Sequence, residues 1–138
     1  MANEAVCIET PTRFGRFTIA AGAVLPFGTS VRLSGDNTVS ATSAADQPFE
    51  GIVWERVSTA TSTHTEITVA LDGVWLMKDG GAGVTRGIPV AIGGANTFVT
   101  GDAGDFVTGS FIGYPEESVG ASGTGRIRLT KFGSSGKL

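Results

Sequence analysis

The chain has 138 residues, 21 of them glycine, and a formal net charge of −3 at neutral pH. This length fits one domain with a workable core, and the acidic balance argues against nucleic acid as a partner, because no basic stripe neutralises phosphates. Glycine beside Val, Ile, Thr and Phe, without sustained helical periodicity, predicts an all-β fold with many tight turns. The single cysteine, Cys7, excludes a disulfide framework within the chain and most multi-thiolate metal sites.

Residues 1–16 are predicted to form an extended N-terminal arm, followed by a single β-domain over 17–132 and a flexible tail over 133–138. The arm shows no signal-peptide pattern, and no apolar run reaches the ~20 residues of a membrane helix, so we expect a protein made in a cytoplasm and no membrane partner. A frayed terminus with one short edge strand is the alternative interpretation of the arm. Its apolar and basic anchors suit docking on another surface: Val6, Ile8, Arg13, Phe14 and Arg16.

One phrase occurs twice, at residues 28–38 and 87–97. Two glycines, a valine, an aliphatic residue, an asparagine and a threonine recur in register, and Asp46 and Asp105 keep the same offset. Each copy predicts a short strand that ends in a turn, where Gly and Asn reach positive φ at low cost. The repeat indicates two similar β-units in one domain, with chance reuse of short β phrases as the alternative. In either case the phrase is structural.

Further strands are predicted around the first copy, at residues 17–20, 49–57 and 65–71, by their alternation of apolar and polar side chains. The last two form a hairpin around a polar loop that ends at His64. Residues 43–46 are predicted to form a short helical turn with a serine N-cap.

The most apolar run of the chain lies between the two copies. Continuous apolarity over a short span predicts burial on both faces, in the core or in a trimer interface. The residues concerned are Val74, Trp75, Leu76 and Met77. The glycine-rich loop at 78–83 is not a phosphate loop, because a strand containing proline follows it.

The last third of the chain is predicted to hold strands at 97–100, 106–114 and 125–131, with a turn at 101–105. The final strand alternates strictly, with Ile127 and Leu129 inward and Arg126 and Arg128 outward. Outward cations along a terminal strand deter pairing with a wrong chain, so we expect this strand at a sheet edge.

No pattern of residues supports catalysis. His64 and Cys7 lie outside any nucleophile motif, and the adjacent Glu116 and Glu117 point to opposite sides of an extended chain. The acidic residues of the glycine-rich loops lack the spacing of a calcium loop; they are Asp79, Asp102 and Asp105. We therefore predict no catalytic residue, no cofactor and no metal, and hence no enzyme.

Four pieces of the chain, in order, carry a resemblance to a known family: residues 21–33, 49–53, 71–74 and 125–129. In these pieces and their order the chain resembles the capsid decoration (cement) proteins of tailed phages, the group of the lambda head-decoration protein. The resemblance implies a small β-sandwich or β-tulip-like barrel. It also implies a homotrimer that binds the outer surface of an assembled head and stabilises the capsid. The arm would dock on the major capsid protein by adding a strand to it.

A carbohydrate- or receptor-binding β-module on a virion or cell surface is the alternative function. It would use exposed aromatic side chains, for which the candidates are Trp54, Trp75 and Tyr114. Burial of Trp54 would count against it. A hydrolase that uses His64 and Cys7 is the third hypothesis.

Overall fold

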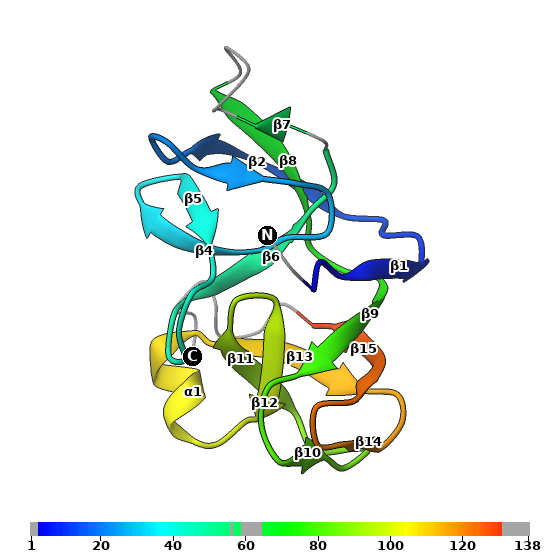
Figure 1. Cartoon of the computed structure of the whole chain (residues 1–138). Helices are drawn as coiled ribbons and strands as arrows, with labels where there is room; N and C mark the ends of the chain where they lie inside the picture. The colour runs from blue at the N-terminus through cyan, green and yellow to red at the C-terminus, as the bar shows by residue number, and fades with distance from the viewer. Residues whose placement is uncertain (1–2, 56, 59–64, 131–138) are drawn as a thin grey trace.

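The computed structural model describes residues 3–55, 57–58 and 65–130 (Figure 1). The all-β prediction is confirmed, with one short helix added. Five strands of the first half close into a barrel in the order β2-β5-β4-β6-β8, and β3 pairs with β7 beside it. These strands are β2 (Phe14–Ile19), β3 (Val24–Leu25), β4 (Ser30–Gly35), β5 (Thr38–Ala41), β6 (Phe49–Val53), β7 (Val57–Ser58) and β8 (Glu66–Ala70).

The second half closes in the same way. Its strands follow the order β9-β12-β11-β13-β15, β15 returns to pair with β9, and β10 pairs with β14. β1 (Val6–Glu9) joins this second barrel along β9. The elements are β9 (Val74–Asp79), β10 (Gly83–Val84), β11 (Val90–Gly94), β12 (Thr97–Thr100), α1 (Gly104–Thr108), β13 (Phe111–Pro115), β14 (Val119–Gly120) and β15 (Thr124–Leu129).

The two barrels repeat each other pair by pair, which confirms the prediction of two matching β-units. Leu33 pairs with Val39 and Gly35 with Thr38 across an irregularity in the first barrel. Ile92 pairs with Phe98 and Gly94 with Thr97 across the same irregularity in the second. The correspondence extends beyond the repeated phrase to all the remaining strands except β1: β2 matches β9, β3 matches β10, β6 matches β13, β7 matches β14 and β8 matches β15.

Two glycines at equivalent places show why the match holds so far from the phrase. Gly51 of β6 and Gly113 of β13 lie where these strands cross β8 and β15. A Cβ atom at Gly51 would overlap the carbonyl oxygen of Ala70, and one at Gly113 would overlap that of Arg128. Only glycine permits this close backbone approach without displacement.

The match of Asp46 with Asp105 is coincidental. Asp46 lies in a turn with a φ of +62°, whereas Asp105 lies in α1. The segments between β5 and β6 and between β12 and β13 differ in length and structure, so the two carboxylates have no common role.

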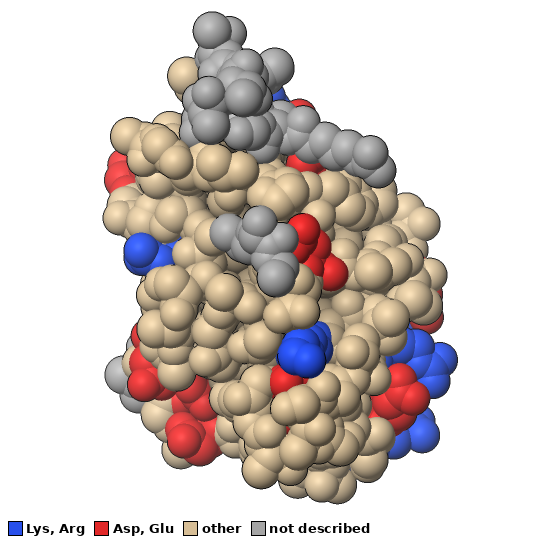
Figure 2. Space-filling view, in the orientation of Figure 1, with Lys and Arg blue, Asp and Glu red and all other residues tan. Residues whose placement is uncertain are grey.

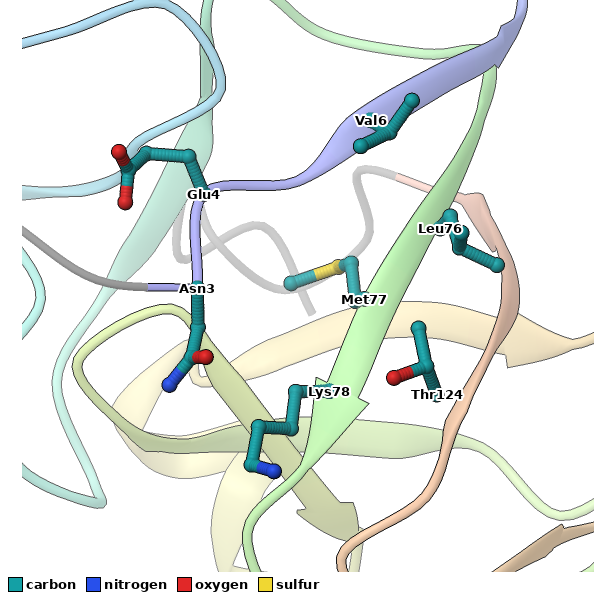
Figure 3. Close-up of a pocket in the computed structure, with 7 residues that line it drawn as sticks. All are labelled: Asn3, Glu4, Val6, Leu76, Met77, Lys78 and Thr124. Atoms are coloured by element: carbon teal, nitrogen blue, oxygen red, sulfur yellow. The ribbon is translucent and has the colours of Figure 1, made fainter.

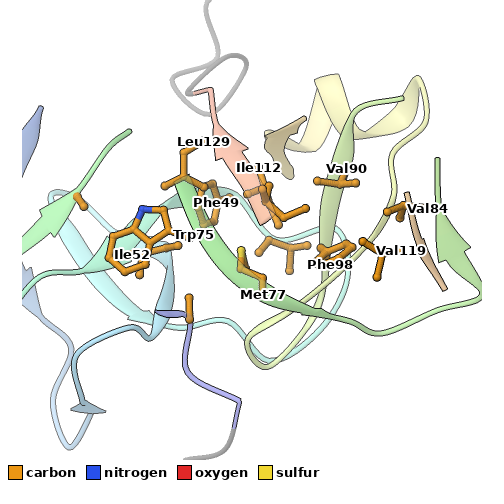
Figure 4. Packing of buried hydrophobic residues seen from close by; sticks show 14 residues of the cluster. Phe49, Ile52, Trp75, Met77, Val84, Val90, Phe98, Ile112, Val119 and Leu129 are labelled. Carbon is orange, nitrogen blue, oxygen red and sulfur yellow. The ribbon is translucent and has the colours of Figure 1, made fainter. Parts of the chain in front are cut away.

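The hydrophobic side chains form two clusters. The smaller fills the first barrel and includes Val31, Val53 and Ile67. The larger fills the second barrel and continues into the junction with the first, where Phe49 and Ile52 join it (Figure 4). Of the apolar run at 74–77, three side chains are at most 1 % exposed within this chain and Leu76 is half-buried; the three are Val74, Trp75 and Met77.

Several local predictions are wrong. Residues 43–46 form a non-helical turn, in which Gln47 accepts the backbone N–H of Ser43 and donates to its hydroxyl. The strand predicted at 106–114 is instead α1, ended by Gly109 in the left-handed region, and then β13. β15 is not an edge strand, because it pairs with both β13 and β9.

The strand predicted from residue 17 begins at Phe14. The expected boundary between residues 16 and 17 therefore falls inside β2. Among the described residues, no helix is long and apolar enough to cross a membrane.

Candidate interaction surface

The N-terminal residues lie along the junction between the two barrels (Figure 1). β1 pairs antiparallel with β9, through Val6 with Leu76 and Cys7 with Trp75. The Ala5 N–H donates to the Gly28 carbonyl of the first barrel at 2.8 Å. This segment therefore contacts both barrels.

The two faces of β1 differ. Val6 and Ile8 point outward, with 55 % and 48 % of their surface exposed, while Cys7 packs against the larger core cluster. Burial raises the pKa of the Cys7 thiol, so the thiolate that a nucleophile requires is disfavoured. The outward face offers two neighbouring aliphatic side chains for contact with another molecule.

A carboxylate anchors the start of β2. Asp72, in the turn before β9, accepts the Thr12 N–H and the Thr12 hydroxyl at 2.7 Å each and the Arg13 N–H at 3.1 Å. Partial burial raises the pKa of Asp72, but these hydrogen bonds outweigh it and leave the pKa below its ordinary value. The ionised Asp72 carboxylate thus holds the N-terminal segment in place.

The outward cations of β15 have partners within the chain. Arg128 lies 3.1 Å from a Glu9 oxygen and 3.3 Å from a Glu116 oxygen, and Arg126 lies 3.3 Å from Glu117. Exposed pairs of this kind add little stability. Figure 2 shows a surface that is mostly uncharged, with acidic and basic side chains side by side at lower right and acidic side chains gathered at lower left.

The five residues predicted for docking are divided between elements of the two barrels. Val6 and Ile8 belong to β1 on the second barrel, whereas Phe14 and Arg16 belong to β2 of the first. The Phe14 ring lies 5.7 Å from that of Trp54. Arg16 pairs with Glu55 at 2.6 Å and with Glu66 at 3.4 Å, and Arg13 is exposed beside the Asp72 anchor.

A cavity of about 160 Å³ lies between the N-terminal segment and β9 (Figure 3). Lys78 at its rim donates to the Ser122 carbonyl at 3.3 Å. The cavity is below the size of typical small-molecule sites, about 300–1,000 Å³, so it does not identify a ligand. Its lining residues are Asn3, Glu4, Val6, Leu76, Met77, Lys78 and Thr124.

The carboxylates considered for catalysis or metal binding stabilise loops and strand ends. One Asp79 oxygen accepts the N–H groups of Gly81, Gly83 and Ser122. An Asp105 oxygen accepts the Asp102 N–H at 2.7 Å, and burial raises the pKa of Asp105. Within the described ranges, no three His, Cys, Asp or Glu side chains are grouped to hold a metal. His64 lies outside the described residues.

The aromatic candidates for a sugar platform mostly lie inside the molecule. Trp75 is fully buried, and half-buried Trp54 packs at 6.0 Å against it, edge to face. Phe27 contacts both rings. Only Tyr114, 43 % exposed, presents a large surface among the three predicted candidates, so they do not form a common stacking platform.

Two features of the junction were not predicted from the sequence. Asn96 is 1 % exposed, and its side-chain oxygen accepts the Ser30 N–H at 2.8 Å. Asp72 anchors Thr12 where the segments from β1 to β2 and from β8 to β9 pass between the barrels. The repeated phrase identifies Asn96 only as a turn residue, because no local signal distinguishes a turn asparagine that meets solvent from one that meets another barrel.

Neither the family models nor the curated proteins include a match to this sequence. Among solved structures, the chain is similar to the head fiber gp8.5 N base of bacteriophage phi29. The TM-score is 0.53 at 16% sequence identity, and the alignment covers 87% of this chain and 97% of that one. This likeness shows a shared fold.

Proposed function

We propose that this chain is a structural protein of a phage particle and binds the outside of the assembled head. The observation that carries the proposal is the fold shared with the phi29 head fiber N base, because it extends over nearly the whole of both chains. The resemblance of several sequence pieces to capsid decoration proteins supports it independently.

In its finer form, the proposal is a homotrimer that stabilises the capsid by contacting the major capsid protein. Val6 and Ile8 support this form, since two exposed aliphatic side chains on one short strand suit an apolar contact. Several such contacts from one trimer would add through avidity.

Binding to heads tests the proposal directly. Purified chain is mixed with heads from the particle encoded in the same genome, and co-sedimentation is measured against chain concentration. We expect saturable binding, and we expect the double variant Val6→Ser/Ile8→Ser to bind at least tenfold more weakly. Absence of co-sedimentation of the unaltered chain would refute the proposal.

The matched control is the double variant Val24→Ser/Ile88→Ser. These aliphatic side chains are 44 % and 45 % exposed and belong to β3 and to the loop between β10 and β11, so the control loses similar apolar surface outside β1. Equal weakening of both double variants would remove β1 from the proposal. Size-exclusion chromatography with light scattering tests the trimer, and a monomer at all concentrations would contradict it.

A further inference from the structure

Among the described strands, one edge of the first barrel has no pairing partner, whereas the equivalent edge of the second barrel is paired. Along β2 and β8, the bonds from Leu71 N–H to Arg13 and from Ile19 N–H to Thr65 show that odd-numbered residues face β8. The backbone groups of Phe14 and Arg16 therefore point away from β8. β5 pairs with β2 only at Thr18 and Ile19, so no described strand covers this edge at 14–16.

The equivalent edge of β9 is occupied by β1. Val74 and Leu76 are the counterparts of Phe14 and Arg16, and β1 pairs beside them in antiparallel direction. The burial differs accordingly, because Val74 is 1 % exposed and Phe14 is 44 % exposed. The second barrel therefore shows how an extended strand fits an edge of this geometry.

The contact between the barrels is head to tail: the end of the first barrel where β4 begins and β5 ends meets the β11–β12 turn of the second. The two barrels therefore contribute different surfaces to it. Ser30 and Thr42 of the first barrel meet Asn96 and Gly94 of the second. The reciprocal contact, at the first barrel's own tip, is not made, since Asn37 is exposed. Asn37 and the edge of β2 at 14–16 are thus uncovered by the described residues, whereas their counterparts in the second barrel, Asn96 and the edge of β9, are covered.

A second copy of this chain is a poor occupant of that face. In the second barrel, Pro89 stands where the first has Ser30, and Gly101 stands where it has Thr42, as the matching backbone bonds establish. Proline lacks the N–H that Asn96 accepts from Ser30, and glycine lacks the hydroxyl of Thr42. Stacking of copies would lose the polar contacts that join the two barrels.

We propose that the edge of β2 at Phe14–Arg16 binds an extended strand of the shell protein, antiparallel to β2, as β1 binds β9. This inference rests on the proposed function and names its contact. Following the register of β1, the incoming strand places one residue opposite Arg16 and another opposite Phe14. Main-chain hydrogen bonds supply the affinity, and the exposed Phe14 ring offers an apolar contact.

Arg16→Pro and Arg16→Ala separate the backbone from the side chain. Both variants lose the ion pairs with Glu55 and Glu66, but only proline removes the outward N–H, which β8 does not use. We expect Arg16→Ala to bind heads within about threefold of the unaltered chain and Arg16→Pro to bind at least tenfold more weakly. Equal binding by the two variants would overturn the inference.

Amide hydrogen exchange of the unaltered chain keeps the test independent of how well Arg16→Pro folds. On binding to heads, the amides of Phe14 and Arg16 are expected to exchange at least tenfold more slowly, and unchanged exchange would overturn the inference. If the chain binds heads without this slowing, the proposed function stands and the strand contact fails. If the chain does not bind heads, both fail. If the amides of Phe14 and Arg16 exchange slowly without heads, and the molar mass in solution rises with chain concentration, the edge binds a second copy and the inference is overturned.

Discussion

The two barrels have the same strand pairings but different surroundings. At the tip of β4–β5, Asn37 is exposed, whereas Asn96 at the tip of β11–β12 is buried against the first barrel. Both residues have positive φ, 49° and 57°, so the local turn is the same. The environment of a turn asparagine is thus decided by which barrel lies next to it.

The barrel interiors differ at the same end. Gly15 of β2 occupies the position that Trp75 has in β9. Gly15 pairs with Val69 on the neighbouring strand β8, and Trp75 pairs with the equivalent Ile127 on β15. Trp75 fills the junction with Trp54 and Phe27. At this strand position the second barrel therefore carries tryptophan, whereas the first carries glycine with the Phe17 ring beside it.

Trp75→Ala is expected to have the largest effect. Removing a fully buried tryptophan leaves a cavity at the junction and should lower the free energy of unfolding by about 3–5 kcal/mol. The measurement is chemical denaturation. Phe14→Ala, on β2 of the first barrel, is the comparison and should cost about 1 kcal/mol; equal losses would show that the two positions are energetically alike.

Asn96→Gly and Asn37→Gly test the turn comparison. Glycine retains access to positive φ, so the difference between the variants reports the side chain alone. Asn96→Gly leaves the buried Ser30 N–H without its acceptor and should cost about 1–3 kcal/mol, while Asn37→Gly should stay within about 0.5 kcal/mol. Denaturation curves of the two variants measure these losses in the free energy of unfolding. A large loss from Asn37→Gly would contradict the different environments of the two asparagines.

Asp72→Asn tests the anchor between the halves and should cost about 1 kcal/mol at pH 7. The folded-state pKa of Asp72 is lowered, so its ionised form stabilises the fold above the unfolded pKa. This contribution is lost as pH falls below the ordinary value and through the lowered one. The difference between wild type and variant, measured by thermal unfolding, should therefore shrink from pH 7 to pH 3. A constant difference would contradict it.

Asp105→Asn tests the segment that differs most between the barrels, and its effect should be the smallest. Burial, with the negative charges of Asp102 and Asp46, raises the folded-state pKa of Asp105, so its ionisation destabilises the fold as pH rises through that range. The amide can still accept the Asp102 N–H. We expect a gain of about 0.5 kcal/mol at pH 7 that vanishes below pH ~4; a loss at pH 7 would refute this.

Much of the fold was predictable from local patterns. The alternation of Ile127 and Leu129 with arginines predicted their inward and outward directions, and the repeated phrase predicted two similar β-units, each with a strand that ends in a turn. The short α1 was missed because Gly109 ends it after little more than one turn, too short for a periodic signal. The docking residues were grouped by closeness in sequence, but β1 and β2 belong to different barrels.

The sequence by itself determined the strands, their turns and the duplication, because side-chain alternation and positive-φ residues act over a few neighbouring positions. Only the tertiary structure decided that Asn96 is buried while Asn37 is exposed, and that β1 covers β9 while no described strand covers the edge of β2 at residues 14–16. These outcomes depend on a head-to-tail contact between residues far apart in the chain, such as Ser30 and Asn96. Because the two copies of the phrase have the same local pattern, that pattern cannot determine which of the two turns is buried against the other barrel.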